Sequence, residues 1–212
     1  MSSTKYMKIY FVRHGQSILN AQNIYQAKHI KLSSLGIEQT KLLANRLKNV
    51  EIDKIIASPY ERTKQTAEII AEKLDKPVVF SEVFKELKRP TEIEGKHVDD
   101  PYAKEVKAQI FQNLHNSDYH YSDEETYYDF RSRAIKALEY LEHLNRKNVL
   151  VVTHGVIIRM LVAIMFLGKE IKADDFKSFR SVLKTNNTGV TICDYIDSKW
   201  RLISWNNFSH LE

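Results

Sequence analysis

The sequence predicts an α/β fold, a three-layer α/β/α sandwich around a mostly parallel sheet. Two observations lead to this prediction. Short apolar segments with the length of strands alternate along the chain with longer amphipathic segments that have the period of a helix. The chain has 212 residues, 43% hydrophobic and 28% charged, which are ordinary values for a soluble globular protein. We therefore expect one domain over residues 1–212.

The first half of the chain contains three predicted strands and two predicted helices. The predicted strands are Met7–Val12, Lys54–Ala57 and Pro77–Phe80. The predicted helices are Leu35–Leu47 and a segment from Ser58 to about Leu74. Ser33 or Ser34 is expected to cap the first helix. Ser58 and Glu61 have the spacing of a capping box, with a proline between them, so we expect Ser58 to be the N-cap of the second helix.

The second half of the chain continues this alternation after an irregular segment. The predicted elements are the helices Thr126–Leu144 and Val156–Leu167 and the strands Val149–Val152, Thr191–Ile196 and Trp200–Trp205. The last two strands are expected to form a hairpin. Residues 88–124 are polar and rich in aromatic residues, contain two prolines and show little periodicity. We expect them to form an excursion over one edge of the domain, facing the substrate.

Polar residues follow three of the predicted strands. Arg13 and His14 follow the first strand, Arg62 lies just after the second, and His154 follows Val149–Val152. The carboxyl ends of neighbouring parallel strands meet at one edge of an open α/β sheet, where ligands bind. We therefore expect these four side chains to share one crevice. Helix N-termini also point there, and their free amides favour an anion.

Two guanidinium groups and two imidazoles form a site suited to a compact dianion, and phosphate is the natural candidate. A neutral imidazole is a good nucleophile toward phosphorus, and arginines stabilise the charge of a transferring phosphoryl group. A metal ion is not expected, because the two arginines repel a cation and the histidines lack the spacing of zinc ligands. No cofactor is expected either.

Composition excludes several other classes of protein. The net charge of +5 comes from scattered lysines rather than a basic stripe, so we expect no nucleic-acid partner. No apolar run reaches the roughly 20 residues of a membrane span, so we expect no membrane partner. The single cysteine, Cys193, excludes an intramolecular disulfide. Residues 1–5 are polar and no signal peptide is present, so the expected location is the cytoplasm.

Four motifs give a more specific indication. They are Arg-His-Gly-x-Ser-x-x-Asn at residues 13–20, a stretch at residues 32–39, Ser-Pro-x-x-Arg-x-x-Gln-Thr-Ala at residues 58–67 and Thr-His-Gly at residues 153–155. Together, and in this order, they resemble the signatures of the histidine phosphatase (phosphoglycerate mutase-like) superfamily. The resemblance extends over most of the chain.

The resemblance implies roles for individual residues. His14 is the expected nucleophile, which becomes phosphorylated, and the other expected pocket residues are Arg13, Arg62, His154, Asn20, Ser17 and Gly155. Ser17 could equally serve as a local cap. The general acid of the family is a carboxylate, and Glu86 matches it best. Glu92 and Glu94 are the alternatives, because the segment around them departs from the family's usual spacing.

Three functions are compatible with this pattern. The leading prediction is a phosphomonoester hydrolase that acts on a small phosphorylated metabolite through a phosphohistidine. The second is a mutase of the phosphoglycerate type. Such relatives have paired basic residues in a longer excursion, whereas only Lys104 and Lys107 lie between His97 and Asp129 here. The third is a non-catalytic protein that binds a phosphorylated ligand on the same fold.

Overall fold

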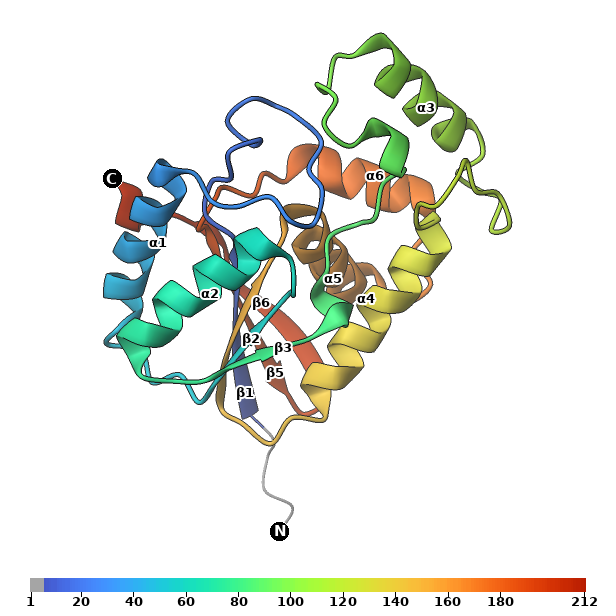
Figure 1. Ribbon diagram of the computed structural model, residues 1–212. Coiled ribbons are helices and arrows are strands. Elements are labelled where there is room, and N and C mark those ends of the chain that lie inside the picture. The colour runs from blue at the N-terminus through green and yellow to red at the C-terminus, as the bar shows by residue number, and fades with distance from the viewer. Residues whose placement is uncertain (1–5) are drawn as a thin grey trace.

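The computed structural model describes residues 6–212, and its fold is the predicted α/β sandwich (Figure 1). Residues 1–5, on which the expectation about targeting partly rests, lie outside the described residues. The elements are β1 (Tyr6–Arg13), α1 (Ser34–Leu47), β2 (Lys54–Ala57), α2 (Glu61–Leu74), β3 (Val78–Phe80), the 3-10 turns η1 (Glu82–Phe84) and η2 (Thr91–Ile93), α3 (Pro101–Gln112), α4 (Tyr127–Glu142), β4 (Asn148–Thr153), α5 (Gly155–Leu167), α6 (Ala173–Val182), β5 (Val190–Ile196), β6 (Lys199–Asn207) and the 3-10 turn η3 (Ser209–Leu211).

The six strands form one sheet in the order β3-β2-β4-β1-β5-β6. The first four strands of that order are parallel, while β5 and β6 form an antiparallel hairpin beside β1. The sheet is therefore mostly parallel, as predicted. Strand β4 lies between β1 and β2, with Val149 opposite both Ile9 and Lys54. This order makes the three strand ends that carry the predicted site direct neighbours.

The central strands are covered on both faces, which explains why they are almost uniformly apolar. Successive side chains of a strand point to opposite faces. Val149 and Val151 pack in one core cluster with residues of α4 and α5, whereas Leu150 and Val152 pack in a second cluster with residues of α1 and α2. Helices therefore cover both faces and hold the strand ends in a fixed arrangement.

The excursion contains regular structure that the sequence pattern did not predict. Helix α3 begins at Pro101, where the side chain of Asp100 accepts a hydrogen bond from the amide of Ala103 at 2.9 Å. Only Ala103 and Val106 of this helix are buried, and they pack with Tyr25 and Ile93 in a small separate cluster. No helix was predicted within residues 88–124, and α3 is a correction to that interpretation: only two of its 12 residues are buried, so its apolar face is small.

The expected capping box at Ser58 is also wrong. Helix α2 begins at Glu61, and its N-cap is Tyr60, whose side chain forms no capping hydrogen bond. The hydroxyl of Ser58 is fully buried at the end of β2 and lies 2.8 Å from Nε2 of His154. The Ser58 side chain, which the local sequence pattern assigned to capping α2, thus forms a tertiary contact with His154 instead. The other predicted cap, Ser33, does accept a hydrogen bond from Gly36 at the start of α1.

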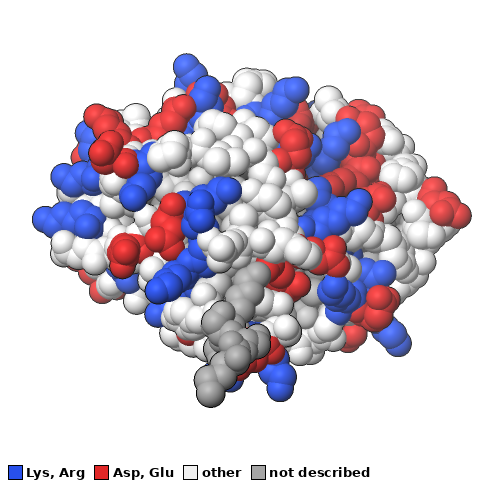
Figure 2. Space-filling view, turned by 90° about the horizontal axis from the view of Figure 1, so that it is seen from below, with Lys and Arg blue, Asp and Glu red and all other residues white. Residues whose placement is uncertain are grey.

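Figure 2 shows the face at the amino ends of the parallel strands, and basic and acidic side chains are interspersed on it. No basic stripe of the kind that follows a nucleic-acid backbone is visible on this face. Within residues 6–212, no helix has both the length and the apolar character needed to cross a membrane.

Candidate active site

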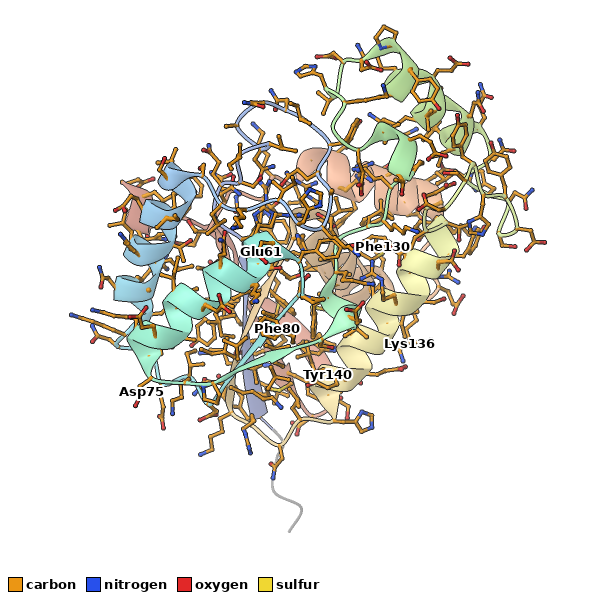
Figure 3. All side chains as sticks on the ribbon, in the orientation of Figure 1. Glu61, Asp75, Phe80, Phe130, Lys136 and Tyr140 are labelled. Carbon is orange, nitrogen blue, oxygen red and sulfur yellow. The ribbon has the colours of Figure 1, made fainter. Side chains whose placement is uncertain are left out.

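A cavity of about 980 Å³ opens at the carboxyl ends of the parallel strands. The predicted site residues that line it are Arg13, His14, Asn20, Arg62, Glu86 and Glu94. Helix α2 points its N-terminus toward this region, and Figure 3 shows it running from Glu61 here to Asp75 at the opposite end of the sheet. The amino end of a helix carries partial positive charge, so the site favours an anion.

His14 is held in one tautomer and one orientation. Its Nδ1 lies 2.7 Å from the carbonyl oxygen of Gly15, which can only accept, so Nδ1 carries the proton. Its Nε2 lies 3.2 Å from Nε of Arg62 and accepts a hydrogen bond from it. Burial, assisted by the charges of Arg62 and Arg13, holds the pKa of His14 well below its usual value. His14 is therefore a neutral imidazole at pH 7, with the lone pair on Nε2.

His154 lies behind His14 rather than in the cavity wall. The two rings meet edge to face, with their centroids 5.2 Å apart, and His154 is fully buried. Its Nε2 bonds to the Ser58 hydroxyl, whereas Nδ1 has no hydrogen-bond partner in the part of the chain that the structure describes. Burial and the charge of Arg62 lower the pKa of His154 strongly. A buried polar atom without a partner is costly, so a ligand that pairs with it gains affinity.

The two arginines of the site carry positive charge that no acid neutralises by direct contact. Arg13 donates to the carbonyl of Thr185 at 2.6 Å, and Arg62 donates to the carbonyl of Ala27 at 3.1 Å. Neither forms an ion pair with a carboxylate of residues 6–212. Burial lowers the pKa of both, that of Arg62 to about 10, so both stay charged at pH 7. Guanidinium groups without a carboxylate partner, one half-buried and one buried, favour an anionic ligand.

Glu86 is anchored at the start of α5. Its carboxylate accepts hydrogen bonds from the amides of Val156 at 3.0 Å and Ile157 at 3.1 Å, so the helix N-terminus fixes its position. Glu94 also lines the cavity, whereas Glu92 does not and instead accepts a hydrogen bond from Ser122 on the exposed surface. Of the three expected candidates, Glu86 is the carboxylate with the most rigid attachment.

The remaining expected pocket residues, which the resemblance assigns to substrate binding, differ in their positions: they are Asn20, Ser17 and Gly155. Asn20 lines the cavity, whereas the Ser17 hydroxyl is buried and caps the local turn, accepting from the amide of Asn20 at 3.1 Å. Gly155 is the first residue of α5, and a Cβ there would lie 2.7 Å from the hydroxyl of Thr185. Ser17 therefore has the local capping role that the sequence left open, and Gly155 permits close packing beside Arg13.

Two residues that sequence reasoning missed hold the backbone around His14. The side-chain amide of Asn187 donates to the His14 carbonyl at 2.9 Å, and the amide of Gly15 donates to the Thr66 hydroxyl at 3.1 Å. Thr66 belongs to the motif at residues 58–67, and that motif could have indicated a role for Thr66 in the site. Asn187 lies in a polar segment before β5, and nothing in its local pattern indicates that it contacts β1.

Comparisons with known proteins agree with this geometry. The chain matches the histidine phosphatase superfamily (branch 1) over residues 9–208. It is 28% identical over 213 residues to an Escherichia coli protein named Probable phosphoglycerate mutase GpmB, with 97% of this chain and 95% of that protein covered.

Solved structures show the same fold. Bacillus stearothermophilus YhfR superimposes with a TM-score of 0.82 at 25% identity, with 97% of this chain and 100% of that chain covered. The phosphoserine phosphatase of Entamoeba histolytica gives a TM-score of 0.78 at 23% identity, with the same coverage of 97% and 100%. The motifs, the sheet order and the match over nearly the whole length lead to one conclusion. The chain belongs to the histidine phosphatase superfamily, branch 1.

Proposed function

We propose that the protein hydrolyses phosphomonoesters of small metabolites through a phosphohistidine at His14. The observation that carries the proposal is the state of this imidazole. Its Nδ1 proton is fixed on a backbone carbonyl, and its Nε2 lone pair lies in the wall of a positively charged cavity. This is the arrangement that a neutral histidine needs to attack phosphorus.

Two displacement steps use the same residues. In the first step, Nε2 of His14 forms a bond to phosphorus and the bond to the leaving oxygen breaks. The leaving alkoxide takes a proton from the carboxyl group of Glu86. In the second step, Glu86 takes a proton from water, the water oxygen bonds to phosphorus and the P–N bond breaks. Inorganic phosphate then leaves, and both residues return to their starting states.

The remaining polar groups act on the phosphoryl oxygens. We propose that the guanidinium groups of Arg13 and Arg62 bind two of these oxygens, and Arg62 exchanges its bond to Nε2 of His14 for a bond to phosphate. We propose that Nδ1 of His154, a buried atom without a partner among the described residues, carries a proton and pairs with a third oxygen when the phosphoryl group binds. Asn20 lines the same cavity and supports the bound group.

A mutase is the second candidate, because the Escherichia coli relative at 28% identity carries that name. A mutase must keep the dephosphorylated product bound while that molecule reorients, so that the phosphoryl group on the histidine can return to a different hydroxyl. The two lysines between His97 and Asp129 give little support for this, because Lys104 pairs with Asp99 at 2.8 Å and is exposed. Lys107 lies over the ring of Tyr25, 6.0 Å from its centroid. We therefore favour hydrolysis.

We also propose that the enzyme acts in the cytoplasm. The proposed substrates carry at least one phosphate dianion, and a charged group crosses a lipid bilayer only at a high free-energy cost. Phosphorylated metabolites are therefore retained in the compartment where they are made. Fractionation of cells that express the protein, followed by immunoblotting of each fraction, tests this location.

The experiment on function traps the intermediate. The protein is mixed with a ³²P-labelled phosphomonoester and quenched, and we expect label on the protein that is lost in acid and retained in base. His14→Ala should remove the label and lower kcat/KM by more than about 10²-fold, because the activated nucleophile is lost. His143→Ala, a change at an exposed histidine, is the matched control.

The product identifies the reaction. Release of inorganic phosphate supports hydrolysis, whereas an isomeric phosphoester without free phosphate identifies a mutase. Tight binding of phosphate or tungstate without turnover of any phosphoester would identify a non-catalytic binding protein and contradict the proposal.

A further inference from the structure

A second cavity, of about 500 Å³, lies beside the active-site cavity. Leu87 and Arg89 line both, so the two cavities share a wall. The apolar side chains of the second cavity come from the excursion and from α4 and α6. They include Ile93, Ile110, Phe111, Leu114, Phe130 and Phe176. Cavities with mostly apolar walls and a few polar groups are typical of small-molecule sites.

Three arginines from different elements meet at this cavity. Arg89 follows η1, Arg159 lies on α5 and Arg180 lies on α6, and all three are half-buried. None of the three has a carboxylate within ion-pair distance among residues 6–212. The one acidic residue found in the described lining is Glu125, and Arg133 already binds its carboxylate at 2.6 Å.

The contacts of these arginines leave donors unused. Arg89 lies over the ring of Tyr25 and Arg180 over the ring of Phe176. Arg159 donates to the Thr185 hydroxyl at 3.0 Å, but its Nε is buried and has no partner within the described chain. Burial, together with the charges of Arg89 and Arg159, lowers the pKa of Arg180. Like charges gathered at half-buried positions without counter-ions are unfavourable unless an anion joins them.

Thr185 joins this cluster to the phosphate pocket. Its carbonyl accepts from Arg13, which lines the active-site cavity, and its hydroxyl accepts from Arg159, which lines the second cavity. The two groups of arginines therefore lie close enough that one member of each forms a hydrogen bond to Thr185.

We propose that the second cavity binds the leaving-group part of the substrate, and that Arg89, Arg159 and Arg180 hold a carboxylate or a second phosphate on an apolar body. The proposal rests on the proposed phosphomonoesterase activity. Guanidinium groups bind either anion through two parallel hydrogen bonds, and the apolar wall packs against the body that carries it.

The test uses a matched set of substrates with the same benzyl body. Benzyl phosphate, its 4-carboxy derivative, its neutral 4-carboxamide and the bisphosphate of 1,4-benzenedimethanol are compared by kcat/KM. We expect the carboxylate, the bisphosphate or both to exceed the carboxamide by roughly tenfold or more, the size of a charge-assisted hydrogen bond. Which of the two anionic substrates is preferred identifies the anion.

Variants locate the effect. Arg180→Met keeps an apolar side chain of similar length and should lower the ratio of anionic to carboxamide substrate at least roughly fivefold. Lys136→Met is the control for net charge, since Lys136 is exposed on α4 and lines neither cavity (Figure 3). Its ratio should match that of the wild type. Arg89→Met serves as the second variant if the melting temperature shows that Arg180→Met does not fold.

The outcomes separate the two proposals. Equal kcat/KM for carboxylate, bisphosphate and carboxamide in the wild type overturns the second anion site while benzyl phosphate hydrolysis still supports the phosphomonoesterase. A preference that survives both Arg180→Met and Arg89→Met also overturns it. Failure to hydrolyse any of the four compounds, or any member of a wider phosphomonoester panel, counts against the proposed function itself.

Discussion

At the scale of single residues, the position of one proton on His154 depends on Ser58. The Ser58 oxygen accepts from the amide of Tyr60 at 3.4 Å, and Nε2 of His154 is the acceptor that the described residues place beside the Ser58 hydroxyl, at 2.8 Å, so we infer that the hydroxyl donates to Nε2. Nε2 then has no proton of its own, and the neutral ring carries its proton on Nδ1. That is the nitrogen without a partner among the described residues, so Ser58 places a proton on the atom that we propose pairs with a phosphoryl oxygen.

Replacing Ser58 tests this assignment. Ser58→Ala should lower kcat/KM roughly tenfold, about the value of one hydrogen bond. A serine with only a structural role would not control the tautomer of His154. The decisive measurement is therefore ¹⁵N NMR of the histidine rings, which reports which ring nitrogen carries the proton. We expect a protonated Nδ1 on His154 in the wild type and a mixture of tautomers in the variant. Ser132→Ala, at an exposed serine of α4, is the matched control. A protonated Nε2 in the wild type would contradict the assignment.

Glu86 is the residue whose proposed role most needs a kinetic test, because its carboxylate also caps α5. A general acid matters most when the leaving group is poor. Glu86→Gln should therefore slow an alkyl phosphate by roughly 10²–10⁴-fold, and p-nitrophenyl phosphate much less. Equal losses on both substrates would make Glu86 a positioning residue. The same comparison would then be made for Glu94, which also lines the cavity.

The site residues show which roles a sequence can reveal. That Arg13, His14 and Arg62 would share one cavity was predictable, because each lies at or just after the end of a plain apolar strand and parallel strand ends converge. The prediction that His154 also lines this cavity is wrong, since its ring packs behind His14. Ser58 was assigned a wrong role because its spacing to Glu61 satisfies the rule for a helix cap. Local patterns record contacts between near neighbours, and the contact of Ser58 with His154 joins residues 96 positions apart.

At the scale of elements, the predictable segments are those with a large buried face. Strand β4 and helix α5 are buried along nearly their whole length, and both were expected within one or two residues of their observed bounds. Helices α3 and α6 were not predicted. Each buries only two residues, Ala103 and Val106 in α3 and Ala173 and Phe176 in α6, so neither has the long buried face by which the other helices were recognised. Both helices line the second cavity, so this part of the site could not be foreseen.

Helix α1 and the turn that carries His14 meet at two glycines. A Cβ on Gly36 would lie 1.9 Å from the carbonyl oxygen of Gln16, and one on Gly15 would lie 2.4 Å from the carbonyl oxygen of Gly36. Both obstacles are backbone atoms, which cannot rotate aside. The start of α1 therefore sets the position of the backbone next to His14 through direct van der Waals contact.

Gly36→Ala should separate these two segments. Overpacking of this kind costs about 1–3 kcal/mol, so we expect the melting temperature to fall by roughly 2–10 °C. Because the displaced backbone carries His14, kcat should fall as well. Leu42→Ala is the control, since Leu42 lies on the same helix and is exposed. An unchanged melting temperature in Gly36→Ala would show that the turn can shift without cost.

At the scale of the whole molecule, two buried histidines and one half-buried histidine make stability depend on pH. Burial lowers the pKa of His14 and His154 strongly and that of His210 to about 4, with nearby arginines acting in the same direction. In the unfolded chain these groups return to about 6.5. Below that pH the unfolded state binds more protons than the folded state, so the free energy of unfolding falls as the pH is lowered. The loss begins near pH 6.5 and continues toward the folded-state values.

Carboxylates give a separate acid transition. Hydrogen bonds and nearby lysines lower the pKa of Asp123, Asp99 and Glu139, so protonation of these groups reduces stability below about pH 4. All three are largely exposed, and solvent screens their contributions. A decline between pH 6.5 and 5 is therefore specific to the histidines and can be measured apart from the general effect of acid.

We expect the melting temperature to fall steadily from pH 7 to pH 5 in the absence of ligand, in a single cooperative transition if residues 1–212 form one domain as the sequence predicts. His14→Gln combined with His154→Gln replaces both strongly shifted groups by uncharged ones and should flatten most of this decline. His143→Gln, at an exposed position, should leave the slope unchanged.

Bound tungstate, an analogue of phosphate, should also flatten the decline of the melting temperature with pH, because an anion beside His154 makes the protonated ring less costly. A flat wild-type profile above pH 5 would mean that water or structural relaxation solvates these rings, and the neutral state assigned to His14 would then need another origin.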